Sequence, residues 1–371
     1  MNNYIMVGCD LHDKSMLIKL AHNRAEPVQK SFNNTPGGRK KMISILKESA
    51  EAANNARIVF AYEASSLGFG LHDELTDVGI DCYVFAPTNI PRSVKHRRRK
   101  TDARDAQRIL EIVRGHFLAG NKMPTVWIPD PQTRDDRELV RMRLGVGKKI
   151  TAIKAQINIL LKRNKFRKPG DIGNNWTKKH RTWLAKSAGS DSALSIGASS
   201  ALNSLLRQLA AMEEEVIYLD KQIRVLAQTD RYAIPVRELS KLKGVGIFTA
   251  MVYLTEMGDL SRFKNRQQVG SYLGLVPSSY ETGNTSDRKG HITHHGPGRV
   301  TRVLCQACWS RVRTDHHERA VHKRICDRNP KHKKIALVAC MRRLGIKMWH
   351  DGLKAQLIAN SFTPKTNQTT A

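Results

Sequence analysis

The sequence predicts an α/β domain at the amino terminus, followed by a mostly helical remainder that contains a long coiled-coil arm. Two observations carry this prediction. In residues 1–125, short apolar runs rich in β-branched and aromatic residues alternate with amphipathic segments, and such runs indicate buried strands. Beyond residue 125, apolar residues recur at spacings of three and four, which indicates helices. We therefore divide the chain into residues 1–125, 126–232, 233–361 and a flexible tail at 362–371.

Strands and helices are expected to alternate in the first 125 residues. The strand candidates span residues 4–9, 16–21, 57–63 and 80–86, and the helix candidates span residues 37–53, 68–78 and 102–116. Two strands that flank a turn at Asp10, then a helix, a strand and further αβ elements, match the order of a ribonuclease H-like fold.

Four carboxylates occupy positions where an uncompensated negative charge is unfavourable in a folded chain. Asp10 and Glu63 each end an apolar strand candidate, where a carboxylate is unfavourable unless a cation compensates it. Asp102 and Asp105 lie three residues apart at the opening of an amphipathic helix, which puts both on one helical face. Four such groups can converge on one or two divalent metal ions. The pattern favours a metal-dependent enzyme that acts on phosphodiesters.

Each of these acids, taken singly, also has a structural explanation. Asp10 could begin a turn into residues 12–14, and Asp102 could be a helix N-cap, a position that Asp prefers. Asp105 would be stabilised in a first helical turn by the helix dipole. The charge of the remaining chain decides between the two interpretations.

The chain is strongly basic. It has 63 Lys plus Arg against 33 Asp plus Glu, a formal net charge of +30 and a pI near 10.2. This excess indicates a polyanionic partner, and nucleic acid is favoured over membrane. No apolar run approaches the ~18 residues of a spanning helix, and Asp10 comes too early for a signal peptide. Six scattered cysteines suit a reducing cytoplasm better than a disulfide framework.

A basic run separates the last strand candidate from the acidic helix. It contains Lys95, Arg97, Arg98, Arg99 and Lys100. A solvated charge run is one interpretation. Beside metal-site carboxylates, however, a basic segment would hold the phosphate backbone against the metals, and we favour this second interpretation.

The middle of the chain carries a coiled-coil pattern. From Leu202 to Leu226 apolar residues follow alternating spacings of three and four over almost four heptads. An earlier helix, near residues 139–161, repeats the pattern less regularly, and the basic segment 162–190 interrupts it. An antiparallel hairpin, a dimerising arm and a helical bundle that packs on itself all remain open.

The C-terminal part contains two loops suited to phosphate. Gly244-Val245-Gly246 resembles the turn of a helix-hairpin-helix motif, in which backbone amides approach a DNA phosphate, although a simple helix connector has the same appearance. Residues 274–296 are rich in hydroxyls and glycines and include the basic residues Arg288 and Lys289. A zinc site is disfavoured, because residues 300–313 read as a helix whose thiols face its packed side. The residues that would form it are Cys305, Cys308, His322 and Cys326.

These segments together resemble one family. Gly8-Cys9-Asp10, Tyr62-Glu63-Ala64-Ser65 and residues 100–106 look like the catalytic tetrad of the DEDD transposases of bacterial insertion sequences. Residues 274–296 are similar to the C-terminal transposase domain of that family. The resemblance covers nearly the whole chain in the family's order, with a RuvC-like domain, a coiled-coil arm and a transposase domain.

The resemblance implies a DNA recombinase of the bacterial cytoplasm, associated with the nucleoid. The tetrad Asp10, Glu63, Asp102 and Asp105 would bind Mg²⁺ (or Mn²⁺), and a C-terminal serine would attack DNA and form a covalent link. A noncoding bridge RNA would supply specificity for DNA at the element ends and target, and the protein would act as a homodimer or homotetramer.

One position departs from the family pattern. Glu281-Thr282-Gly283 matches the family's Glu-Ser-Gly or Ser-Ser-Gly context, so a threonine occupies the nucleophile position. Ser278, Ser279 and Ser286 lie nearby, but none of them matches the motif.

Two other functions explain part of the sequence. A structure-specific metal-dependent nuclease, such as a junction resolvase, would use the same tetrad with water as the attacking group. It would leave the C-terminal hydroxyl-rich loop without a role. A nucleic-acid-binding protein with an inactive tetrad would account equally well for the net charge of the chain.

Overall fold

The chain forms two compact units, Met1–Ile128 and Pro129–Ala371, and each is described here by itself. The computed structural model describes residues 3–90, 101–189, 193–279, 289–293, 295–330 and 333–362. The predicted basic run, Thr282 and Arg288 therefore lie outside the described residues, as do residues 363–371 of the predicted tail. The finer division of the chain at residues 232 and 233 stays a prediction.

The first unit is built on a five-stranded sheet in the order β3-β2-β1-β4-β5. β1 pairs antiparallel with β2, which pairs antiparallel with β3, whereas β1, β4 and β5 run parallel. Most side chains of the central strands β1 and β4 are buried, as expected for strands covered on both faces. The strands span Tyr4–Leu11 (β1), Ser15–His22 (β2), Val28–Asn33 (β3), Arg57–Glu63 (β4) and Asp81–Phe85 (β5).

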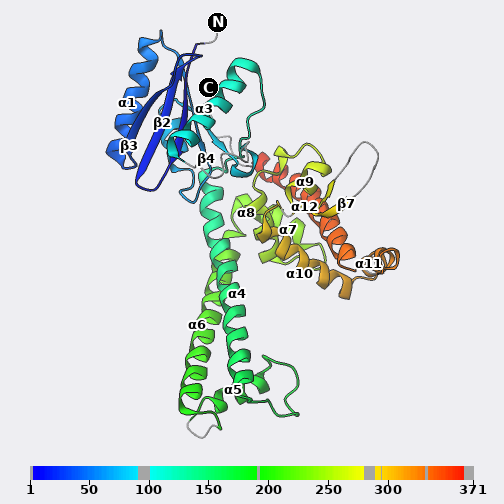
Figure 1. The fold of residues 1–371 in the computed structure, drawn as a ribbon. Coiled ribbons are helices and arrows are strands. Elements are labelled where there is room, and N and C mark those ends of the chain that lie inside the picture. The colour runs from blue at the N-terminus through cyan, green and yellow to red at the C-terminus, as the bar shows by residue number, and fades with distance from the viewer. Residues whose placement is uncertain are drawn as a thin grey trace. The chain divides into compact units, whose positions relative to one another are not determined.

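Helices cover both faces of this sheet (Figure 1). α1 (Pro36–Ala52) and α2 (Gly70–Asp77) pack on one face, and their buried residues share a core with Val7 and Phe60. α3 (Asp102–Ala119) packs on the other face, where its Ile109, Leu110 and Val113 share a second core with Met6 and Ala61. A short 3-10 helix, η1 (Pro87–Asn89), follows β5.

Gly8 lets α3 approach β1 at backbone distance. A Cβ atom at this position would lie 2.2 Å from the carbonyl oxygen of Ala106 and 2.4 Å from the backbone nitrogen of Leu110. Since no side chain fits in that space, only glycine permits the contact. Side chains alternate along a strand, so Met6, Gly8 and Asp10 lie on the α3 side of the sheet. The approach therefore brings the first turn of α3 to the strand ends.

The predicted elements of the first unit are confirmed with shifts of a few residues at their ends. The structure also contains β3, a strand that the sequence did not predict. This strand lies at the edge of the sheet, and only Lys30 and Phe32 among its residues are even half-buried. An edge strand with so little apolar surface leaves a weak pattern in the sequence.

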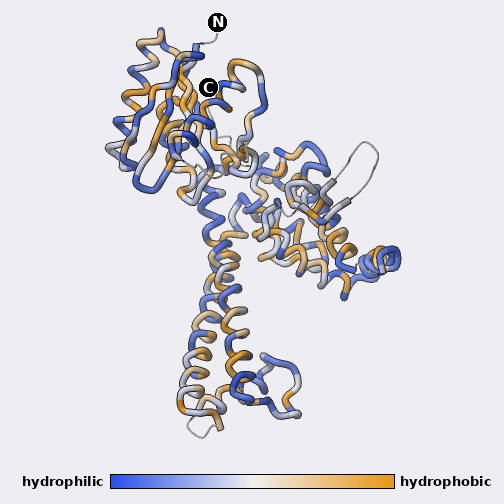
Figure 2. The backbone as a smooth tube through the Cα atoms, in the orientation of Figure 1, coloured by the Kyte–Doolittle hydropathy of each residue, from blue (hydrophilic) through white to orange (hydrophobic). Residues whose placement is uncertain are grey.

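The second unit begins with a long helical hairpin. α4 (Pro131–Arg163) and α6 (Ile196–Leu226) pack side by side, and α5 (Lys178–Ser187) covers their far end (Figure 1). Leu202 and Leu209 of the predicted seam share a core with Ile153, Ile157 and Leu160 of the same chain. Figure 2 shows hydrophobic and hydrophilic residues alternating in short bands along both helices. The seam thus packs within one chain, as an antiparallel hairpin. The sequence did not predict α5, which lies within the basic segment 162–190.

The remaining helices form the largest core of the protein. They are α7 (Asp230–Ser240), α8 (Ile247–Met257), α9 (Arg266–Tyr272), α10 (Gly298–Thr314), α11 (His316–Arg328) and α12 (Lys334–Phe362), with a 3-10 helix η3 at Leu260–Arg262. This core also includes Val140 and Leu144 of α4 and Ile223 of α6. The base of the hairpin is therefore part of the same packed body as the C-terminal helices.

Two arginines of α4 hold the end of α8. Arg137 is buried and donates hydrogen bonds to the carbonyl oxygens of Thr255 and Glu256, at 2.7 and 2.9 Å. Arg141 donates to both carboxylate oxygens of Glu256, also at 2.7 and 2.9 Å. Carbonyls in the last turn of a helix have no partner within the helix, so Arg137 satisfies two of them.

A small hairpin sheet lies among the C-terminal helices. β6 (Pro277–Ser279) and β7 (Lys289–Ile292) pair antiparallel, and they flank residues 280–288 in the chain. The sequence predicted a loop over this whole segment, and it did not predict the two strands. No helix in the described part of the chain is long and apolar enough to cross a membrane.

Candidate metal centre

Two of the four predicted carboxylates lie at the carboxyl ends of neighbouring parallel strands. Cys9 of β1 pairs with Tyr62 of β4, so the next positions along these strands are Asp10 and Glu63. Side chains at paired positions of parallel strands point to the same face, about 4.8 Å apart. Both carboxylates thus lie on the face of the sheet that α3 covers.

The other two carboxylates come from the first turn of α3. Asp102 is the first residue of the helix and its side chain is 54% exposed, whereas the side chain of Asp105 is only 14% exposed. Asp105 pairs with Arg108, one turn further along, at 3.0 Å. The alternative that Asp102 is the helix N-cap is wrong, because Thr101 occupies that position.

His12 joins the two groups. Its Nε2 atom lies 3.2 Å from Oδ2 of Asp10 and 3.5 Å from Oδ1 of Asp102. One ligand atom from each of these three residues lies within 4.8 Å of the other two, a spacing that a single metal ion can bridge. His12 is a site residue that the sequence pattern did not predict. The signal was the spacing Asp10-Leu11-His12 at a strand end, which puts both polar side chains on one face.

Asp10 is the most constrained of these groups. Its Oδ2 atom is buried, and among the described residues its close cationic neighbour is the imidazole of His12, at 3.2 Å. Burial raises the pKa of the Asp10 carboxyl; His12 lowers it, and the nearby carboxylates of Asp102 and Asp105 raise it. A bound cation would relieve the cost of a buried carboxylate that lies among other acids. Carboxylate oxygens of this kind suit Mg²⁺ or Mn²⁺.

The structure brings together only part of the predicted set. Asp10 and Asp102 meet directly, and Asp105 acts on Asp10 through its charge. Glu63 is adjacent to Asp10 in the sheet but does not belong to the group within 4.8 Å. Among the residues described, this is the sole cluster of three metal-ligating side chains at that spacing.

Gly244 and Gly246 lie in the connection between α7 and α8. Gly244 has a left-handed φ of 79°, and a Cβ atom there would lie 2.6 Å from the carbonyl oxygen of Ala307. Close packing on α10 therefore requires a glycine at position 244. Gly246 is exposed and is the N-cap residue of α8, and it makes no side-chain hydrogen bond there. Contact of either glycine with nucleic acid stays a prediction, as does contact of Lys289, whose backbone lies in β7.

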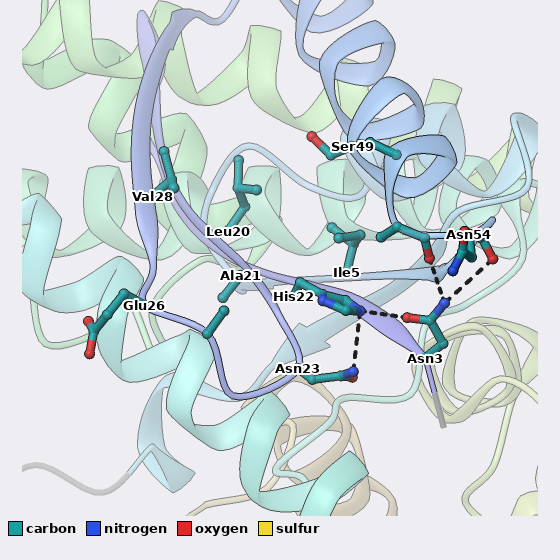
Figure 3. Close-up of a pocket in the computed structure, with 13 residues that line it drawn as sticks. Asn3, Ile5, Leu20, Ala21, His22, Asn23, Glu26, Val28, Ser49 and Asn54 are labelled. Atoms are coloured by element: carbon teal, nitrogen blue, oxygen red, sulfur yellow. Dashed lines mark hydrogen bonds between the residues drawn. The ribbon is translucent and has the colours of Figure 1, made fainter. Parts of the chain in front are cut away.

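A cavity of about 630 Å³ lies at the other end of β1 and is unrelated to the acids (Figure 3). Asn3 and His22 hydrogen-bond there at 2.6 Å between Oδ1 and Nε2. Glu26 is the one carboxylate among the residues that line it. This cavity therefore offers no set of metal ligands.

Two family models match the chain. One, described as a transposase of the DEDD type from the IS110 group, matches residues 7–165, which include the four predicted carboxylates. The other, described as the transposase IS116/IS110/IS902 family, matches residues 236–323, which include β6, β7 and Thr282. The cluster of possible metal ligands lies at the strand ends, within the stretch that the first model matches. Together with the two matching models, it defines the class of this protein as a transposase. The chain belongs to the IS110 family of transposases.

Curated relatives agree with this family. The chain is 31% identical over 253 residues to the y4qE protein of Sinorhizobium fredii, which is named as a candidate transposase. That match covers 68% of this chain and 58% of the relative, so the chain spans little more than half of that protein. The transposase for insertion sequence element IS1533 of Leptospira borgpetersenii is 24% identical over 315 residues, which cover 83% of this chain and 86% of the relative.

Proposed function

We propose that this protein is a DNA transposase that cleaves and rejoins strands with a metal-binding acidic centre and a hydroxyl nucleophile. The observation that carries the proposal is the cluster of Asp10, His12 and Asp102, whose ligand atoms lie within 4.8 Å of one another around the buried Oδ2 of Asp10. The family supports DNA as the substrate, and the net charge of +30 suits a polyanion. The strand order of the sheet supports a ribonuclease H-like domain of the RuvC type.

Asp10, Glu63, Asp102 and Asp105 would hold Mg²⁺ or Mn²⁺ in this proposal. When bound, a divalent ion would polarise the scissile phosphate and stabilise the leaving oxygen. The residues of the chain supply the geometry, because the strand ends fix Asp10 and Glu63 while α3 carries Asp102 and Asp105. His12 is 44% exposed and contacts two carboxylates, so it is placed to exchange a proton between them and solvent.

Thr282 is the proposed nucleophile. It follows β6 and precedes β7 in the chain, between two paired strands that would fix the ends of its segment. Hydroxyls of Ser and Thr both act as covalent nucleophiles once activated. The extra methyl of threonine crowds in-line attack, so we expect slower chemistry than a serine would give. Arg288 and Lys289 would neutralise the phosphate at this position.

Further partners are part of the proposal. We include a noncoding bridge RNA that pairs with donor and target DNA, action as a homodimer or homotetramer, and association with the nucleoid of a bacterial cytoplasm. Lys95, Arg97, Arg98, Arg99 and Lys100 would bind phosphates next to the acidic helix.

A labelled element end incubated with the protein and Mg²⁺ tests the reaction class. A covalent protein–DNA adduct is expected for the transposase. Free nicked ends without an adduct would instead indicate a nuclease that uses water. A mobility shift without cleavage, in Mg²⁺ and in Mn²⁺ alike, would indicate a binding protein and refute the proposed activity.

The nucleophile is tested by substitution on the same substrate. Thr282→Ala should abolish the adduct, and Thr282→Ser should keep or increase it. An adduct that survives Thr282→Ala and disappears with Ser278→Ala, Ser279→Ala or Ser286→Ala would transfer the role to that serine.

A further inference from the structure

The second unit contains a groove of about 1730 Å³ between α9, the β6–β7 hairpin and the first half of α12. Figure 1 shows these three elements close together at one side of the C-terminal helices. The groove is made entirely by the second unit, and none of the four predicted carboxylates lines it.

The lining of the groove is cationic, and no acid of the described residues compensates its charge. Five basic side chains line it, and no Asp or Glu is among the described residues that do so. None of the five has an ion pair with a described acid, whereas Arg141, Arg143 and Arg181 elsewhere in this unit each pair with a carboxylate. The five are Arg266, Lys333, Lys334, Arg342 and Arg343. Such a concentration of like charge is unfavourable unless an anion enters it.

Arg342 is placed by the backbone of α9. A Cβ atom at Gly270 would lie 2.9 Å from Nε of Arg342, so the absence of a side chain there makes room for the guanidinium. Its Nε is buried and has no hydrogen-bond partner among the described residues. A buried guanidinium nitrogen without an acceptor is costly, and a phosphate oxygen would satisfy it.

The amino terminus of α12 adds to this positive field. Lys333 and Lys334 lie at the start of the helix, and its first turn contains no acid. The helix dipole is positive at this end, so lysines there oppose helix stability in the absence of an anion.

The groove also has an apolar lining. Leu275, Pro277, Ile292, Val338 and Ile346 belong to it. A lining with both basic and apolar side chains suits a single nucleic-acid strand, whose phosphates contact cations while its bases contact apolar groups. A duplex hides its base faces, so it would engage the cations alone.

We propose that this groove binds a single strand of nucleic acid, which Arg342 and Arg343 hold by its phosphates. The inference rests on the proposed function only in taking nucleic acid, rather than another polyanion, as the occupant. Because β6 and β7 form one wall, a bound strand would run beside the hairpin that carries Thr282 between its strands.

Fluorescence anisotropy of the full-length protein in EDTA tests this groove without any cleavage. The probes are a labelled 16-nucleotide DNA strand, the same sequence as RNA, and the DNA strand annealed into a duplex. We expect Arg342→Gln with Arg343→Gln to weaken binding of the single strands at least threefold more than binding of the duplex. The slope of log affinity against log salt should fall by about 1.4, since single strands release roughly 0.7 counterions per phosphate contact.

Two further variants separate geometry from charge. Lys40→Gln with Lys41→Gln removes two exposed charges from α1 and should leave single-strand binding within twofold of the wild type. Gly270→Ala keeps the net charge but displaces the Arg342 guanidinium, and it should also weaken single-strand binding at least threefold. A groove variant that loses no more affinity than the α1 variant, or loses it equally for duplex and single strand, would overturn the proposal.

Failure of this proposal and failure of the proposed activity give different results. Asp10→Asn should keep the loss of single-strand affinity caused by Arg342→Gln with Arg343→Gln, because Asp10 does not line the groove. Loss of cleavage in Asp10→Asn with an unaffected groove variant would refute only the groove. Single-strand binding that depends on Arg342 and Arg343, without any cleavage by the wild type, would refute only the enzyme.

Discussion

The ionised carboxylate of Asp10 is unfavourable in the folded state. Its Oδ2 is buried, and burial raises the pKa of the carboxyl. A carboxyl whose pKa is raised in the folded state destabilises the protein at pH values above that pKa, where it must be ionised. If a metal ion binds as proposed, it should therefore stabilise the fold through this side chain.

Asp10→Asn separates these two effects. Removing the charge should abolish Mn²⁺ binding measured by calorimetry, because the neutral amide cannot replace a carboxylate ligand. In EDTA the free energy of unfolding should stay level or rise by up to about 1 kcal/mol. Asp13→Asn is the matched control, since Asp13 is an exposed acid of the same turn. Retention of Mn²⁺ affinity in Asp10→Asn, or equal loss in the control, would remove Asp10 from the metal site.

The sequence predicted the strand-end acids but not their histidine partner. Asp10 and Glu63 stood out because a carboxylate at the end of an apolar run conflicts with burial. His12 follows the strand in a polar turn, where a histidine has no such conflict with burial, so its spacing from Asp10 was the one signal in the sequence. Only the return of α3 to the strand end, with Asp102, shows that His12 contacts two carboxylates.

At the scale of elements, the contact between β1 and α3 determines whether the acids meet. Gly8 leaves no room for a side chain between the strand and the helix. The hydrophobic pattern predicted both elements, but it contained no information on how closely they approach. A glycine within a strand was the available signal for such an approach.

Gly8→Ala should disrupt this contact. The new methyl would lie 2.2 Å from the carbonyl oxygen of Ala106, so α3 must shift away from the sheet. We expect a loss of about 1–3 kcal/mol in the free energy of unfolding, together with weaker Mn²⁺ binding. Gly37→Ala is the control, because open space surrounds that position and alanine favours the helix. If Gly8→Ala kept full stability and Mn²⁺ affinity, close packing would not position α3.

The packing of α4 against α6 leads to a second prediction at the scale of elements. Leu209 is 3% exposed between the two helices, whereas Ile217 is 71% exposed on α6. Leu209→Ala should lower the local stability of the hairpin by about 2–4 kcal/mol, because it leaves a cavity. Ile217→Ala should change it by less than about 0.5 kcal/mol. Hydrogen exchange of the α4 and α6 amides measures both, and equal protection in the two variants would contradict the packing.

The sequence identified the seam of this hairpin but not its partner. A repeat of three and four fits a helix of the same chain as well as one of another chain, since both bury the same face. The structure shows that Leu202 and Leu209 pack against α4. α5 was missed because its ten residues include only two large apolar side chains, Trp183 and Leu184.

At the scale of the whole molecule, net charge dominates association. A chain with +30 should bind nucleic acid with a steep dependence on salt, because each phosphate contact releases counterions. Charge on this scale attracts duplex and single strand alike. Specific contacts must therefore be recognised by how substitutions change the salt slope and not by affinity alone.

Neutralising Arg97, Arg98 and Arg99 to Gln tests the basic run. If the run contacts phosphates, the salt slope for duplex DNA should fall by about 2.7, which is roughly 0.9 for each contact. The control neutralises Lys40, Lys41 and Lys47, which are exposed on α1. Fluorescence anisotropy over a salt series measures both variants. An identical slope in the two would show that the run is a solvated charged segment.

The length of the helical hairpin amplifies any change at its base. α4 has 33 residues, which correspond to roughly 50 Å, and its base shares the core of the C-terminal helices. A tilt of about 10° at the base would move the far end through about 9 Å. A substitution that repacks Val140 or Ile223 should therefore displace α5 much more than it displaces the base itself.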